Sequence, residues 1–331
     1  MNIDTTTRVQ CQKVCNRWWD IIKTTWCAVR HVVILSTSST VRNHVIDGTG
    51  DTVTIVSPAI DSLEQGLHRQ HAVRFLKTVN PANRQRFLTL IVHPRTPLSS
   101  QVDECHYNII SQCSRLTSLT TEVVDADMIK LISESKTLQE LTLNYNGDSY
   151  VHSSMWDPLI ELTTLKKLAI LSRVEVRSGR CVQLQLPLGT AFLGKVALNL
   201  RKLESISIGA SVYLTDGGMK WLTFLPCLKE VRINCCALLT GKFLEELQHV
   251  EVVILTGCGI RDEGVIPLLK ASRTLRKLGL GGTAITNDTI VAAIQETWKR
   301  TNGIVLTLDV SCTYTDVSAF QETPPLLELI I

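Results

Sequence analysis

The sequence has few aromatic residues and no long hydrophobic run. Aromatic residues make up 5% of a chain that is 44% hydrophobic, so any core must be built mainly from aliphatic side chains. No stretch approaches the ~18 consecutive apolar residues of a membrane-spanning helix, and Met1–Gln10 lacks the apolar run of a secretory signal. The formal net charge of +3 is too small to predict nucleic acid or a membrane surface as the main partner.

The eleven cysteines do not form a recognisable disulfide or metal-binding pattern. Their number is odd, and no C-x-x-C pair occurs. His68 and His71 have a spacing that a metal can use on a helix, but two histidines do not supply the four ligands of a zinc site. We therefore expect no disulfide, buried free thiols of which few react in the native protein, no metal and no cofactor. Free thiols indicate a reducing compartment, so we expect a cytoplasmic or nuclear protein.

The motifs of common enzymes are also missing. No G-x-S-x-G elbow occurs, and the glycines of Gly279–Gly282 lack the lysine of a phosphate-binding loop. Asp216 and Asp262 precede expected helices, so we predict that they are helix N-caps and not acid–base catalysts. The sequence thus predicts a binding protein and not an enzyme.

A repeated pattern of apolar residues organises the chain. Its spacing is L-x-x-L-x-L-x-x-C, and three consecutive copies begin at Leu228, Val250 and Leu275. The middle of each copy alternates as a strand does, and the last position can bond backbone groups where the chain turns. The intervals of 22 and 25 residues (228 to 250, 250 to 275) are those of leucine-rich repeats.

Further copies extend the pattern over most of the chain. In this register they begin at Val29, Phe87, Leu116, Leu138, Leu165, Leu203, Val305 and Leu326. The early match at Val29 alone carries little weight, since one such match can arise by chance. Return helices are expected at Thr190–Leu200, Gly264–Ser272 and Asp288–Lys299. The predicted fold is an α/β, right-handed leucine-rich-repeat solenoid with a parallel inner sheet and with its consensus apolar positions buried.

Departures from the repeat predict the domain organisation. We expect a short helical segment over residues 1–28 and an irregular repeat domain over 29–331. Ser36–Gly50 is expected to be a loop, Thr52–Val56 a strand and Leu63–Val79 a helix. Within residues 172–188, two alternating stretches flank Ser178-Gly179, which predicts a hairpin insertion. Such an insertion lies either on the binding face or on the outer surface.

The N-terminal segment resembles part of a known module. Arg8–Ile22 is similar to the second half of an F-box, with Val14, Cys15, Arg17 and Trp18 matching its V-C-x-x-W region and Trp26 following. An F-box followed by repeats is the order found in the F-box/leucine-rich-repeat family. The alternative is that Trp18 and Trp26 cap the first apolar face of the solenoid.

The resemblance implies a partner and a function. It implies docking of Val14, Cys15, Arg17 and Trp18 on the Skp-type adaptor of a cullin ubiquitin ligase, with the repeats capturing a protein substrate. The L-P-x-E-[LI]-L helix that opens the family's F-box, and supplies much of its adaptor contact, does not occur in this sequence. We therefore expect this chain to bind the adaptor weakly or not at all. The second hypothesis is a repeat scaffold or regulator outside any ligase.

The repeat alignment also predicts a partner-binding face. Residues between the consensus apolar positions should point to the concave side. From these we select the following candidates: Lys167, Glu230, Arg232, Val252, Ile254, Lys277 and Asp309. Val252 and Ile254 would form an apolar strip framed by Arg232 and Lys277, a pattern that suits a protein or peptide partner. Alternatively, a loop or the C-terminal end of the same chain covers the strip. The glycines of Gly279–Gly282 are expected to leave a shallow spot on the same side.

Overall fold

The computed structural model describes residues 30–38, 45–49, 52–59, 81–92, 110–123, 125–145, 152–172, 174–177, 180–183, 185–316, 320 and 324–331. The chain forms two compact units, Met1–Asp148 and Ser149–Ile331. We call them the N-terminal and C-terminal units and describe each by itself. The expected F-box-like segment and the expected helix at Leu63–Val79 lie outside the described residues and stay predictions.

The C-terminal unit is built on a parallel sheet in which each strand pairs with the strand of the next repeat. The strands are β7 (Lys167–Ser172), β10 (Ser205–Ile208), β11 (Glu230–Ile233), β12 (Val252–Ile254), β13 (Lys277–Gly279), β14 (Leu306–Asp309) and β15 (Leu327–Ile330). Equivalent residues of consecutive repeats are paired, for example Val231 with Val253 and Val253 with Leu278. The strands therefore stack in the register that the repeat pattern predicts.

Burial in these strands alternates with the period of two that a strand imposes. The consensus residues Leu168, Ile206, Val231, Val253 and Leu278 are each at most 2% exposed. The residues between them, on the other face, are mostly half-buried or exposed. Because consecutive strand side chains point to opposite faces, one face of the sheet forms the core and the other faces solvent.

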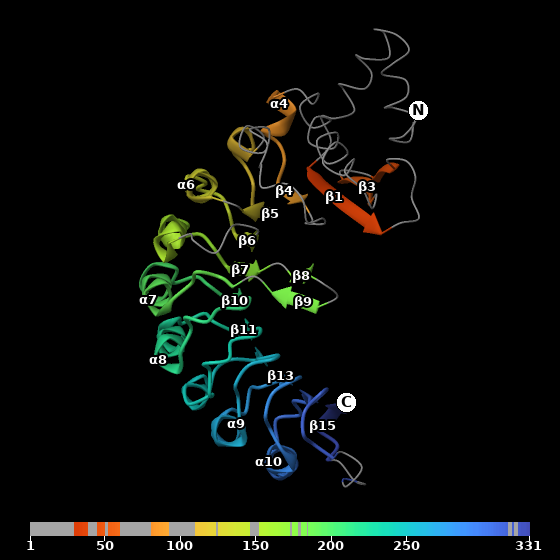
Figure 1. The fold of residues 1–331 in the computed structure, drawn as a ribbon, viewed down its shortest axis with the longest axis vertical. Helices are drawn as coiled ribbons and strands as arrows, with labels where there is room; N and C mark the ends of the chain where they lie inside the picture. Colours follow the sequence, from red (N-terminus) through yellow and green to blue (C-terminus); the bar gives the residue numbers. More distant parts are fainter. Residues whose placement is uncertain are drawn as a thin grey trace. The chain divides into compact units, whose positions relative to one another are not determined.

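Helices lie along one side of this sheet, as Figure 1 shows for α7 to α10. The helical elements are η2 (Ser153–Glu161), α7 (Thr190–Asn199), α8 (Asp216–Met219), η3 (Lys220–Phe224), η4 (Leu244–Glu246), α9 (Asp262–Ala271) and α10 (Asn287–Trp298). Each returns the chain from the end of one strand to the start of the next. The expected helices are thus present to within two residues at their ends. The leucine-rich-repeat fold is confirmed for the described repeats, and we call the side of the sheet opposite the helices the inner face.

The same backbone conformation recurs where several of the strands end. Cys235, Gly257, Gly282 and Cys312 occupy equivalent positions with φ between +55° and +67°. The backbone N–H of each of the first three donates to a carbonyl of the next repeat at 2.8 Å. The side chain of the next residue donates a hydrogen bond to a backbone carbonyl. Cys258 Sγ donates to Ile233 O (3.6 Å), and Thr283 Oγ1 donates to Leu280 O (2.7 Å). The last consensus position therefore closes the turn off the strand, as predicted.

The N-terminal unit also contains a row of strands that pair side by side. Its order is β6 (Glu140–Tyr145), β5 (Ser118–Val123), β4 (Thr89–Val92), β1 (His31–Ser38), β3 (Thr52–Ala59) and β2 (Val45–Thr49), with α4 (Pro81–Arg84) and α6 (Ala126–Ser133) between strands in sequence. Val32 pairs with Leu90, so the early copy at Val29 belongs to the repeat register. All neighbours are parallel except β2, which is antiparallel to β3.

Two expectations from the sequence are wrong here. Ser36–Gly50 was expected to be a loop, but β1 reaches Ser38 and β2 occupies Val45–Thr49. The composition is loop-like, yet Val45 and Ile46 pair with Val56 and Ile55, and such pairing overrides local preference.

In the C-terminal unit, Val305 is 45% exposed although it stands at a consensus position, because Leu306 is the residue buried there.

The insertion after β7 is a hairpin of its own. β8 (Val174–Arg177) and β9 (Arg180–Gln183) pair antiparallel in a separate two-stranded sheet. The chain rejoins the repeats where Leu186 N donates to Ala210 O at 2.7 Å and Ser211 Oγ donates to Leu188 O at 2.8 Å. The alternating pattern in the sequence therefore corresponds to a two-stranded extension of the C-terminal unit.

Candidate functional site

The predicted partner-binding residues form two rows across the inner face of the C-terminal unit. Strand register places Lys167, Ser205, Glu230, Val252 and Lys277 in one row. The second row runs through Ala169, Ser207, Arg232, Ile254, Gly279 and Asp309. Neighbouring strands are ~4.8 Å apart, so residues next to each other in a row are in reach of one ligand. The repeat alignment thus brings all seven predicted residues onto one surface.

The two cations that frame the apolar strip have different surroundings. Arg232 lies opposite Ile254 and binds the carboxylate of Glu230 through its Nε. Ser205 Oγ donates to the same carboxylate at 3.0 Å. Lys277 lies opposite Val252, and no described residue hydrogen-bonds or ion-pairs with its side chain. A partner carboxylate therefore meets a free ammonium group at Lys277 and an engaged guanidinium at Arg232.

Val252 and Ile254 are half-buried and not fully exposed. For Ile254 the reason is Gly279 on the neighbouring strand, because a Cβ at Gly279 would lie 3.2 Å from Ile254 Cγ2. Ile254 therefore occupies the hollow that the glycine leaves. We expected the glycines of β13 to form a shallow spot on the inner face, and at Gly279 this is wrong. Part of the apolar strip is covered by its own neighbour strand, and the rest remains available.

The carboxylate of Asp309 accepts hydrogen bonds from a residue at the end of its own strand. Its Oδ1 accepts from Ser311 N at 3.0 Å and from Ser311 Oγ at 2.7 Å. The anion therefore has a held orientation on the inner face, on the strand next to Lys277. The remaining predicted site residues, Val14, Cys15, Arg17 and Trp18, lie outside the described residues, so adaptor docking there stays a prediction.

The predicted N-caps Asp216 and Asp262 have a different role. The N-cap residues are Thr215 and Arg261, and each aspartate is the first residue of its helix. The Asp216 carboxylate accepts from Thr240 N (3.1 Å), Thr240 Oγ1 (2.5 Å) and Gly241 N (3.1 Å) of the next repeat. These side chains therefore join consecutive repeats. The N-cap prediction was wrong because each carboxylate accepts hydrogen bonds from the turn of the following repeat and not from its own helix.

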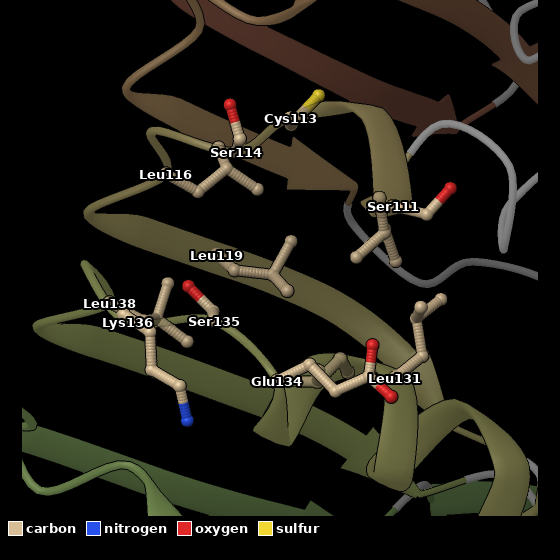
Figure 2. Close-up of a pocket in the computed structure, with 12 residues that line it drawn as sticks. Ser111, Cys113, Ser114, Leu116, Leu119, Leu131, Glu134, Ser135, Lys136 and Leu138 are labelled. Atoms are coloured by element: carbon tan, nitrogen blue, oxygen red, sulfur yellow. The ribbon is translucent and has the colours of Figure 1, made fainter.

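A pocket in the N-terminal unit is the cavity that Figure 2 shows. It has a volume of about 350 Å³ and lies between β5, residues 110–116 and residues 131–138. Leu119 lies in its apolar lining, and Ser111, Ser114 and Ser135 supply hydroxyls. Cys113 also lines it, and burial raises the pKa of its thiol to about 12, with a smaller opposite effect of Arg84. A thiol with that pKa is protonated at neutral pH and is a poor nucleophile.

The described residues contain neither a metal-binding cluster nor a membrane-spanning helix. Among them, no three histidine, cysteine, aspartate or glutamate side chains come together to hold a metal ion. In the same part of the chain, none of the helices has the length and apolar character needed to cross a membrane.

Comparison with known proteins gives structural likenesses alone. No protein-family model matches the sequence, and no curated protein matches it. Among solved structures, an internalin (InlF) of Listeria monocytogenes is similar with a TM-score of 0.42 and 14% identity, over 71% of this chain and 64% of that one. Internalin C2 of the same organism is similar with a TM-score of 0.39 and 13% identity, over 78% of this chain and 91% of that one. This chain thus spans 64% of the length of the first internalin, and the fold itself is established by the repeat register described above.

Proposed function

We propose that this protein is a leucine-rich-repeat scaffold that binds a protein partner on the inner face of its C-terminal unit. The observation that carries the proposal is the pair of side-chain rows in which Val252 and Ile254 lie between Arg232 and Lys277. An apolar centre beside charged groups suits a protein partner, since apolar contacts supply affinity and charges orient the complex.

The chemistry of the rows indicates what the partner offers. Covering Val252 and what remains open of Ile254 is worth ~25 cal/mol per Å² of apolar surface buried. Lys277 favours a carboxylate at the neighbouring point of the partner. Arg232 already binds Glu230, so it contributes less new charge pairing. We therefore propose a partner segment with an apolar side chain next to an acidic residue.

Affinity capture from cell extract tests this proposal when the wild-type chain is compared with Ile254→Arg and with Lys277→Glu. Both substitutions should deplete the same protein at least tenfold, which corresponds to about 1.4 kcal/mol of binding free energy. Lys270→Glu is the matched control, because Lys270 is an exposed lysine on α9, on the helix side. A set of captured proteins that is the same for all three variants would remove the inner face as the binding surface.

A second candidate function rests on the residues that resemble an F-box. Val14, Cys15, Arg17 and Trp18 match its V-C-x-x-W region, and repeats follow. On this hypothesis the chain is the substrate receptor of a cullin-type ligase, and the inner face holds the substrate. The test is a pull-down with purified Skp-type adaptor, with and without an L-P-x-E-[LI]-L helix added upstream. Binding by the extended form that is lost in Trp18→Ala supports this function, and failure of both forms to bind leaves the scaffold.

The remaining proposals concern catalysis and compartment. We propose that the protein has no enzymatic activity, and the protonated thiol of Cys113 removes one candidate nucleophile, the cysteine that lines the pocket. We also propose a cytoplasmic or nuclear location. Cys236 and Cys258 support it, because both are buried at equivalent repeat positions and donate S–H groups to backbone carbonyls, a role that requires the reduced form.

A further inference from the structure

The charged residues on the inner face of the C-terminal unit follow a definite order from strand to strand. Strand register places these charged side chains on that face: Lys167, Glu230, Arg232, Lys277, Asp309 and Glu328. Lys167 lies on β7, three strands from the apolar strip on β12, and Glu230 and Arg232 on β11 bind each other. On the other side of the strip, β13, β14 and β15 carry one cation followed by two anions.

The two anions are held in place by hydroxyl groups and not by cations. Glu328 Oε2 accepts from Thr307 Oγ1 at 3.0 Å, and Asp309 Oδ1 accepts from Ser311 Oγ at 2.7 Å. Within the described part of the chain, neither carboxylate forms an ion pair, and Lys277 forms none either. A hydroxyl donor orients a carboxylate but leaves its negative charge, so all three charges remain available to a partner.

The charged residues where the strands begin do not change this order. Lys229 pairs with Glu204 at 3.8 Å, and Arg276, next to Lys277 in the chain, pairs with Glu251 at 3.2 Å. Each of these cations is therefore matched by an anion of the preceding repeat. The charge presented across β13, β14 and β15 is that of Lys277, followed by Asp309 and Glu328.

We propose that the partner segment carries an apolar, an acidic and a basic side chain in that order, from β12 toward β15. This inference rests on the proposed function, because it describes the segment bound on the same face. The apolar side chain covers what is open of Val252 and Ile254, and the acidic one pairs with Lys277. The basic one is attracted by both Asp309 and Glu328. Complementary charges of this kind fix the register and direction of a bound segment.

The dimensions of an extended chain fit this order. β12 and β15 are three strand spacings apart, which is ~14 Å at ~4.8 Å per spacing. In an extended segment every second side chain faces the same way, and residues i and i+4 are ~13 Å apart at ~3.3 Å per residue. A segment that crosses the strands therefore has the pattern apolar-x-acidic-x-basic. The reversed charge order would bring a basic group to Lys277 and an acidic group to Glu328, and repulsion between like charges disfavours it.

Selection from a displayed library of random short peptides on the full chain tests the proposal. Peptides enriched on the wild type should show the apolar-x-acidic-x-basic pattern and bind Ile254→Arg at least tenfold more weakly. The double variant Lys277→Glu with Glu328→Lys exchanges the charges of β13 and β15, so it should enrich the apolar-x-basic-x-acidic pattern instead. High salt should weaken the binding of both sets of peptides, because salt screens exposed charges.

A second charge exchange is the matched control. Lys299→Glu with Glu296→Lys reverses an ion pair on α10, on the helix side, and should enrich the wild-type pattern. Thermal unfolding of each variant shows that it is folded. Peptides that depend on Ile254 but show no charge order, or the same order on the Lys277→Glu, Glu328→Lys variant, overturn this inference and leave the proposed function. Peptides that bind Ile254→Arg as well as the wild type, or no enrichment above the Ile254→Arg background, overturn both.

Discussion

The carboxylate of Asp262 is bound by Thr286 of the following repeat. Thr286 donates to it through its backbone N–H (3.0 Å) and its Oγ1 (2.9 Å), and Thr289 Oγ1 adds a third bond at 2.5 Å. Asp216 binds Thr240 in the same way 24 residues on, and Asn287 Oδ1 accepts from Asp316 N. The polar side chain of the first helical residue thus hydrogen-bonds to the following repeat in three cases, and we call each such set of bonds a joint between repeats.

Replacement of Asp262 by Ala tests this joint. The variant loses three hydrogen bonds to a charged acceptor, and we expect a loss of about 1–3 kcal/mol in the free energy of unfolding, measured by denaturant titration. Glu263→Ala is the control, since Glu263 is exposed in the same helical turn and shares the interaction with the helix dipole. Equal losses in the two variants would contradict a specific joint at Asp262.

The same joint predicts a dependence on pH. Burial raises the pKa of the Asp262 carboxyl, but hydrogen bonds from Thr289 and Thr286 outweigh burial and lower it below its ordinary value. A depressed folded-state pKa gives stability that is present above the unfolded pKa of about 4 and is lost as pH falls through the folded value. The stability difference between wild type and Asp262→Asn should therefore be largest near neutral pH and shrink in acid. A difference that stays constant down to the lowest pH would exclude this linkage.

Close contact between repeats predicts that no side chain larger than that of glycine is tolerated at position 264. A Cβ at Gly264 would lie 2.6 Å from Thr240 O and 2.7 Å from Gly241 Cα, both backbone atoms. Gly264→Ala should cost about 1–3 kcal/mol, as overpacking does. Gly217→Ala is the comparison, because its nearest atom would be 3.9 Å away, and it should leave stability unchanged or raise it slightly. Thermal unfolding of the two variants side by side decides the matter.

Because Gly282 has a left-handed backbone conformation at the strand end, we expect its replacement by Ala to lower the free energy of unfolding through backbone strain. At Gly282 φ is +67° and a Cβ would have its nearest neighbour at 3.7 Å, so Gly282→Ala adds strain without a clash. We expect a loss of about 1–2 kcal/mol. Cys312 has φ of 56° in the equivalent place, so Cys312→Gly relieves that strain and should be neutral or stabilising. If Gly282→Ala unfolds at the wild-type denaturant concentration, the strain argument fails.

Thiol labelling separates six of the cysteines into two groups. Cys227, Cys235 and Cys312 are exposed and should react in the native protein, which corrects the expectation of few reactive thiols. The buried residues Cys113, Cys236 and Cys258 should react only after unfolding. The pKa of Cys258 is raised by its hydrogen bond with Cys236 and by burial, which keeps it a protonated thiol. Rapid native labelling of Cys258 would show that the turn position is open.

The sequence by itself determined the strands and the side of each that is buried. Val231, Val253 and Leu278 could be placed because a strand alternates with period two and each repeat stacks on an equivalent one. The same periodicity placed Arg232 and Lys277 on either side of Val252 and Ile254, and it indicated Cys236 and Cys258 as turn residues. These features depend on neighbours in sequence or on copies of the same pattern.

The tertiary structure alone decided which residues of different repeats meet. The binding of Asp262 to Thr286, the covering of Gly279 by Ile254, and the pairing of Val45–Thr49 with β3 each join segments whose register no local preference specifies. Leu238 lies on the surface because Leu239 fills the core first, a competition between two adjacent leucines that packing resolves and hydrophobicity does not.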